Sequence, residues 1–318
     1  MPIKNRPIRM QSFLSIENDK LVVSEGAGLV EVCKNPKDAE ITALIGKYNI
    51  DKHNVDSALD PDENGRLEFE PDHVVIILKR PRNYCSKDNF FFKVTSIGVF
   101  LFANKMLIVM RDDISIFDGK TTFPMKTLND ILFRLIYSTI SHFMGHLKAI
   151  NQISEELEDK INYSYENKYL LNMFTLEKSL VYFLNSITFN AAVFEKLKYN
   201  SAKIGFTPDN IELLDDIIIE NSQCLTLTQT YSNILSSLMD ARVSLISNNL
   251  NVMMKNLNAI VIAVAIPSFF AGVGGMSEFS GMTGSANWKI SYFLFICAML
   301  VIGIITFYVI RYFERYWK

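Results

Sequence analysis

Charge is missing from two long stretches of the sequence. No Asp, Glu, Lys or Arg lies between Lys255 and Glu278, and none lies between Lys289 and Arg311. Each stretch is close to the ~20 residues that cross a membrane as a helix, whereas a core helix of a soluble domain usually keeps a polar stripe. We therefore expect two transmembrane helices joined by a short hairpin. The first span, the hairpin and the second span are expected at residues 257–276, 277–288 and 289–311.

Cysteine is scarce, and the usual marks of an enzyme are missing. The four cysteines lie far apart and form no CxxC pair, which argues against a disulfide framework or a structural zinc site. The sequence has no Gly-rich phosphate loop, no Ser-His-Asp order and no paired catalytic carboxylates, so we expect neither an enzyme nor an organic cofactor. The net charge of −2 argues against a nucleic-acid surface.

The first residues lack the apolar segment of a signal peptide, so we expect the N-terminal part to stay in the cytoplasm. A hairpin of two spans returns the C-terminus to the same side of the membrane. Lys255 precedes the first span, and Arg311, Arg315 and Lys318 follow the second, in agreement with the excess of positive charge on cytoplasmic loops. Residues 312–318 would form a basic cytoplasmic end, and only the hairpin would face outward.

Residues 1–125 read as an α/β domain with a small sheet. Four segments are rich in the β-branched and aromatic residues typical of strands: GLVEVC, HVVIILKR, NFFFKVTSIGVFLF and MLIVMR. In residues 126–206 the apolar positions recur every three or four residues, and the polar stretch NYSYENKY divides them. This pattern predicts an antiparallel pair of helices. The cytosolic part is therefore expected to be of the α+β class.

Glycine and proline are absent between Pro208 and Pro267. Because both residues interrupt helices, their absence predicts one continuous helix, which would run ~90 Å between the two prolines from the cytosol into the first span. We expect the whole helix over residues 207–276. A single chain cannot easily cover the apolar stripe of so long a helix. Symmetric association of several copies about an axis normal to the membrane would cover it.

One face of this helix is small or polar where it enters the membrane. Steps of three and four residues give Asn251, Met254, Asn258, Val261, Ala265, Ser268, Gly272 and Gly275. Two explanations are open: close packing of helices through small residues, or a narrow axial pore. Amides and hydroxyls that faced lipid would lose their water partners, so the two asparagines and the serine favour a wet pore.

The order of these parts and three local segments resemble the CorA family of divalent-cation channels, which form funnel-shaped pentamers. NNLNVMMKNLNAI resembles the family's segment where the long helix enters the membrane, IPSFFAGVGGM its proline-containing stretch, and ANWKISYF the start of its second span. The resemblance covers essentially the whole chain. It implies a homopentamer in the cell inner membrane.

The same resemblance assigns the outer mouth of a pore. The family's Gly-Met-Asn signature falls on Gly275, Met276 and Ser277, so a serine stands where the family has asparagine. The family's acidic Met-Pro-Glu is also absent, and the only carboxylate in the hairpin is Glu278. The Ser277 hydroxyl would meet the hydrated ion, and a ring of Glu278 side chains would concentrate cations.

Further roles are implied by the resemblance. Met254, Leu257 and Val261 would form a hydrophobic constriction near the cytosolic end. The whole pore lining would comprise Asn251, Met254, Leu257, Asn258, Val261, Ala265, Ser268 and Gly272. Carboxylates between neighbouring cytosolic domains would bind regulatory Mg²⁺; the candidates are Asp216, Asp240, Asp56 and Asp60.

The function implied is passive influx of a divalent cation, Mg²⁺ above all, driven by the membrane potential and gated by cytosolic divalent ions. Two alternatives remain open. One is a CorA-like transporter of Zn²⁺ or another transition metal, because the mouth residues differ from the family pattern. The other is a non-conducting membrane scaffold or ion sensor with the same architecture.

Two further motifs imitate metal sites. DPDENG at residues 60–65 matches the first half of an EF-hand loop, but Pro71 stands where the bidentate Glu belongs, so we expect an ordinary turn. His142 and His146 share a helix face at a spacing that could hold zinc, without a catalytic Glu between them. We expect these histidines to lie at the surface or interface of the helical pair.

Overall fold

The computed structural model describes residues 11–17, 19–24, 26, 28–85, 88–114, 116–117, 124–163, 167–275 and 288–316. The chain divides into two compact units, Met1–Met239 and Asp240–Lys318. The boundary falls inside helix α6 (Pro208–Gly274), so the first part of α6 belongs to the first unit and the remainder to the second.

A seven-stranded sheet forms the centre of the first unit, with the order β2-β1-β3-β7-β6-β5-β4. Only β3 and β7 pair in parallel; the other neighbours are antiparallel. The four segments predicted as strands are β3, β5, β6 and β7, whereas β1, β2 and β4 were not predicted. The strands are β1 (Gln11–Glu17), β2 (Lys20–Ser24), β3 (Val30–Lys34), β4 (Arg66–Phe69), β5 (His73–Pro81), β6 (Val94–Phe102) and β7 (Met106–Met110).

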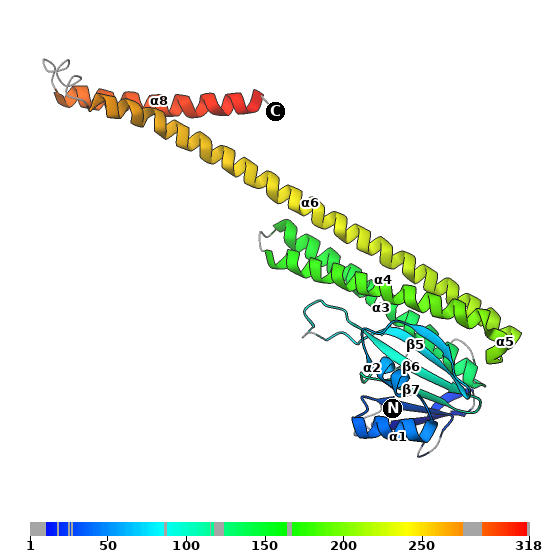
Figure 1. Cartoon of the computed structure of the whole chain (residues 1–318). Coiled ribbons are helices and arrows are strands. Elements are labelled where there is room, and N and C mark those ends of the chain that lie inside the picture. Colours follow the sequence, from blue (N-terminus) through cyan, green and yellow to red (C-terminus); the bar gives the residue numbers. More distant parts are fainter. Residues whose placement is uncertain are drawn as a thin grey trace. The chain divides into compact units, whose positions relative to one another are not determined.

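Helices cover both faces of the sheet (Figure 1). Alternate residues of each central strand enter different cores: Leu107 and Val109 pack with α1 (Asp38–Tyr48) and α2 (Lys52–Leu59), while Ile108 packs with the helical pair on the other side. Every residue of β7 is buried as a result, and a strand covered on both faces reads as a continuous apolar run.

The helical pair consists of α3 (Leu128–Tyr163) and α4 (Asn167–Tyr199), followed by the short helix α5 (Ser201–Ile204). The first part of α6 packs on this pair through side chains of the same core, among them Leu214, Ile217 and Cys224. The starts of α3 and α6 are also linked, because the Asn210 amide donates to the Asp130 carboxylate at 3.3 Å.

The buried amide of Asn190 joins α4 to the sheet. Strand β4 pairs with β5 only as far as Ile77. Two residues further along β5, the Lys79 backbone N–H donates to Asn190 Oδ1 at 2.8 Å, and the Asn190 Nδ2 donates to the Lys79 carbonyl at 2.8 Å. The side chain thus satisfies both backbone groups of a buried residue that β4 is too short to reach.

Asn190→Ala is expected to destabilise the first unit by about 3 kcal/mol, because two buried backbone groups lose their partners and a cavity forms. Denaturant unfolding of the full chain in detergent would measure the change. The exposed Asn185 on the same helix provides the matched control, since Asn185→Ala should change stability by less than about 0.5 kcal/mol. Equal effects of the two substitutions would contradict this role of Asn190.

Candidate functional site

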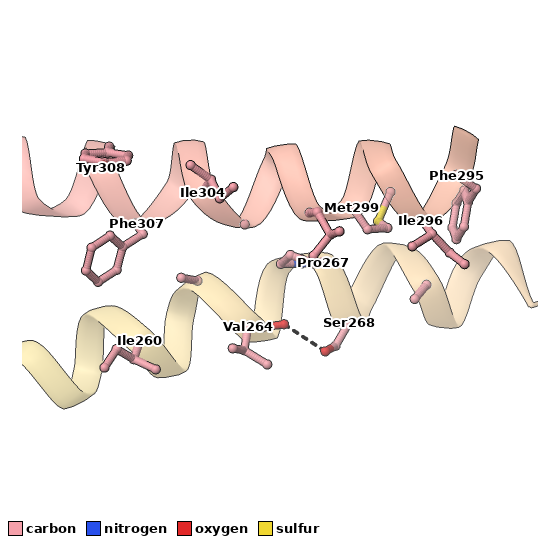
Figure 2. A pocket seen from close by; sticks show the side chains of 14 residues that line it. Ile260, Val264, Pro267, Ser268, Phe295, Ile296, Met299, Ile304, Phe307 and Tyr308 are labelled. Carbon is pink, nitrogen blue, oxygen red and sulfur yellow. Dashed lines mark hydrogen bonds between the residues drawn. The ribbon is translucent and has the colours of Figure 1, made fainter. Parts of the chain in front are cut away.

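The second unit contains a hairpin of two helices, the remainder of α6 and α8 (Trp288–Tyr316). Both helices include runs that are long and apolar enough to cross a membrane by length and composition. The helices lie side by side, as Figure 2 shows for the middle of the hairpin. On α6 the less exposed side chains are Asn256, Ala259, Ala263 and Pro267, spaced by three and four residues, and they mark the face that α8 covers.

The two helices approach each other closely at Gly303 of α8. A Cβ at Gly303 would come within 3.2 Å of the Ala263 carbonyl oxygen and 3.3 Å of the Pro267 ring. Because Pro267 has no N–H, the carbonyl four residues earlier, that of Ala263, receives no helical hydrogen bond. Glycine therefore lets the α8 backbone pack against the one carbonyl that the proline leaves unbonded.

A polar contact joins the helices near the basic end of the hairpin. The Arg311 guanidinium donates to the Asn256 side-chain oxygen at 3.0 Å, and it lies 5.8 Å from the centre of the Phe307 ring. An arginine in this position can extend its charge towards the lipid headgroups while its stem packs along the helix.

The small and polar face expected from the sequence lies on the opposite side of α6 from α8. At ~100° per residue, the two sets of positions are centred roughly 170° apart. All eight predicted residues are exposed in the single chain: Asn251, Met254, Asn258, Val261, Ala265, Ser268, Gly272 and Gly275. Contact with the chain's own α8 is therefore not the reason for this face, which we call the small-residue face.

The side chains of the candidate constriction are also exposed in the single chain. Met254, Leu257 and Val261 are 54%, 52% and 56% exposed, although all three are apolar. Ala259, between them in sequence but turned towards α8, is 1% exposed. The constriction residues therefore have no partner within the described part of the chain.

Ser268 differs from the other polar residues of this face. Its hydroxyl donates to the Val264 carbonyl at 2.8 Å, as the dashed line in Figure 2 marks, so the donor is satisfied within the helix. Ser268 also lines the edge of an apolar groove of ≈ 770 Å³ between α6 and α8. Its hydroxyl oxygen can still accept a hydrogen bond from water.

The expected pore mouth is described only in part. Gly275 directly follows α6, and its N–H donates to the Ala271 carbonyl at 3.1 Å. Met276, Ser277 and Glu278 lie outside the described residues.

The four candidate regulatory carboxylates, Asp56, Asp60, Asp216 and Asp240, are all exposed. Within the described residues, no group of three or more His, Cys, Asp and Glu side chains could hold a metal ion. One chain therefore does not assemble these carboxylates into a site, and any shared site would need ligands from another copy.

The loop at residues 60–65 contacts the buried side chain of Lys79. Lys79 is a buried residue of β5. Its ammonium donates to the Pro61 carbonyl at 2.6 Å and to the Ser96 hydroxyl at 3.2 Å. Burial lowers the pKa of Lys79, and the charges of Asp62, Asp60 and Glu63 oppose that shift. Within the loop, the Asp62 backbone N–H donates to the Asp60 carboxylate at 2.9 Å, which stabilises the turn. The acidic residues of the loop thus favour the charged form of a buried lysine. The sequence alone did not reveal this role.

Comparison with known proteins gives a consistent result. The sequence model of a family described as CorA-like Mg²⁺ transporter protein matches residues 32–312. A cobalt/magnesium transport protein CorA from Methanocaldococcus jannaschii is 28% identical over 288 residues, which is 88% of each chain. The protein with the same description from Thermotoga maritima is 23% identical over 271 residues, 82% of this chain and 74% of its own.

The fold is shared as well. The complete structure of the CorA magnesium transporter from Methanocaldococcus jannaschii matches 96% of this chain and 98% of its own, with a TM-score of 0.76 at 23% identity. The predicted fold class, an α+β domain followed by a long helix and two candidate membrane helices, is confirmed.

Gly303→Leu is expected to separate α8 from α6, because the new side chain would overlap the Ala263 carbonyl and the Pro267 ring. Overpacking of this kind costs about 1–3 kcal/mol, so the melting temperature of the detergent-purified protein should fall. Ala298→Leu adds a larger side chain at an exposed position of the same helix and should leave the melting temperature unchanged. A Gly303→Leu variant as stable as the natural protein would disprove the close contact.

Proposed function

The chain belongs to the family of CorA-like Mg²⁺ transporter proteins, and on this premise we propose that it forms a homopentameric channel for passive Mg²⁺ influx across the inner membrane. Proteins of this family transport ions and are not enzymes. In the proposed channel, α6 of each copy lines a central path and α8 lies outside it. The N- and C-termini are cytoplasmic, and only the hairpin faces outward.

The small-residue face carries this proposal. It is exposed, it lies opposite α8, and it combines small side chains with amides, whereas the other residues of α6 from Leu257 onward are apolar. In a ring of copies with α8 on the outside, this face meets the axis. Small side chains leave room for water, and amides such as Asn251 and Asn258 can bind the hydration shell of an ion that gives up its waters reluctantly.

The mouth of the proposed channel uses a hydroxyl where the family pattern has an amide. Five copies of Ser277 would offer hydroxyl oxygens to the hydrated ion, and five copies of Glu278 would raise the local cation concentration. The electrical driving force is sufficient, because a divalent charge gains roughly 4.6 kcal/mol on moving inward across ~100 mV.

Gating in this proposal combines two elements. Met254, Leu257 and Val261 would close the path by excluding water from an apolar ring. Cytosolic Mg²⁺ would favour that closed state by binding between copies, at sites drawn from Asp216, Asp240, Asp56 and Asp60. The exposure of all four carboxylates keeps them available to a neighbouring copy.

Uptake into proteoliposomes tests the function. Purified protein should admit Mg²⁺ down a potential of about 100 mV, read with an encapsulated Mg²⁺ indicator, and Ser277→Asn should alter selectivity without being required for flux. Co²⁺, Ni²⁺ and Zn²⁺ are tested in parallel. Uptake of Zn²⁺ alone would replace the proposal with a transition-metal transporter. Uptake that appears only in Ser277→Asn, or not at all, would indicate a scaffold or sensor.

A pair of alanines tests the axial path. Ala265 lies on the small-residue face and Ala263 on the face towards α8, about 160° away around the helix. In a background with Cys85 and Cys297 replaced by serine, a charged methanethiosulfonate reagent should cut Mg²⁺ uptake about tenfold in Ala265→Cys by obstructing the path. The same reagent should leave Ala263→Cys unaffected. Equal block of the two variants would contradict a path along the small-residue face.

A further inference from the structure

His142 and His146 form a close pair on α3. Their Nε2 atoms lie 3.0 Å apart, and the two rings meet edge to face. His146 is 8% exposed and packs against Phe92 from the loop before β6 and against Phe183 of α4. His142 is half-buried, so this ring is the more accessible of the two.

Neutral imidazole is the form that binds a metal, and the surroundings favour it. Burial, together with the positive charge of Arg80, lowers the pKa of His146 to about 4. The hydrogen bond between the two Nε2 atoms needs an N–H on one ring and a lone pair on the other.

The distance between the two nitrogens matches that of adjacent ligands on one metal ion. For metal–nitrogen bonds of ~2.0–2.1 Å, nitrogens 3.0 Å apart subtend an angle of about 90–97° at the metal. Neighbouring ligands of square-planar and octahedral ions meet at about 90°. We propose that His142 and His146 together bind one transition-metal ion in the cytosolic unit, with water completing its coordination.

The chemistry of the pair selects the ion. Imidazole nitrogen suits Cu²⁺, Ni²⁺, Co²⁺ and Zn²⁺, whereas Mg²⁺ prefers oxygen. The nearby Arg80 guanidinium is held by the Ile116 carbonyl at 3.3 Å and by the hydroxyls of Ser138 and Thr139 at 3.4 and 3.5 Å. Its charge repels a dication, so only ions that form strong bonds to nitrogen can overcome it, with Cu²⁺ first in the general order of affinities.

Proton balance permits this binding at neutral pH. Both Nε2 lone pairs must face the metal, so each ring would carry its proton on Nδ1 in the metal-bound form, and the ring that donates its Nε2–H in the free pair would change tautomer. No net proton is released when both rings begin neutral. The site lies outside the proposed ion path and does not depend on conduction, so failure of Mg²⁺ uptake would leave it standing.

Cu²⁺ titration of the untagged, full-length protein in detergent tests the proposal. We expect one tightly bound Cu²⁺ per chain, with electron paramagnetic resonance and electron spin echo modulation showing two imidazole nitrogens. His142→Gln should remove that equivalent and its nitrogen signals, and excess Mg²⁺ should not displace the ion. His53, exposed on α2, supplies the control, because His53→Gln should keep both the stoichiometry and the spectrum.

Two results would overturn the proposal. One is a spectrum of the natural protein with only oxygen ligands, as expected of carboxylate sites. The other is an unchanged two-nitrogen spectrum in His142→Gln. Because His146 is buried and its replacement could disturb folding, His146→Gln is read together with its circular dichroism. A folded His146→Gln variant should lose the same equivalent of Cu²⁺.

Discussion

A membrane helix can turn only one face towards each neighbour, and this constraint governs the second unit. Gly303 lets α8 approach α6 closely at Pro267, where a carbonyl has lost its helical hydrogen bond. That contact uses one face of α6 and leaves the opposite face, with its amides and small side chains, uncovered. Hydrocarbon is a poor environment for such groups. The hairpin is consequently incomplete as a monomer, and both the proposed assembly and the proposed water path follow from the face that α8 does not reach.

Much of the architecture could be predicted from the sequence because its signals are long and local. The lack of Gly and Pro up to Pro267 predicted the continuous helix α6, and the two uncharged runs predicted the candidate spans. Strands β1, β2 and β4 escaped prediction because two of them, β1 and β4, have mixed, half-buried patterns and β2 has an exposed edge. Their place in the sheet is decided by pairing with distant strands, and no short window contains that information.

In the candidate site, too, the features with local sequence signals were predicted and the features that depend on distant residues were not. Helical periodicity found the small-residue face, because three- and four-residue steps need only local sequence. The side of α6 taken by α8 depends on the fit of Gly303 to Pro267, 36 residues apart in sequence, and so could not be read from the pattern. The acidic loop at 60–65 was expected to be an ordinary turn, and its contact with Lys79 could not be predicted because Lys79 lies on β5, 18 residues after Pro61. Asn190 was missed for the same reason.

In the loop at residues 60–65, the cation that contacts the backbone is the ammonium of Lys79 and not a metal ion. A metal ion at this position would come and go with its concentration, and the loop would order and disorder with it. Lys79 is attached covalently to β5 and cannot dissociate. The contact between the Lys79 ammonium and the Pro61 carbonyl is therefore made without any metal ion. The Asp60 carboxylate remains exposed, so a cation that bound there would add to this loop from outside without displacing the lysine.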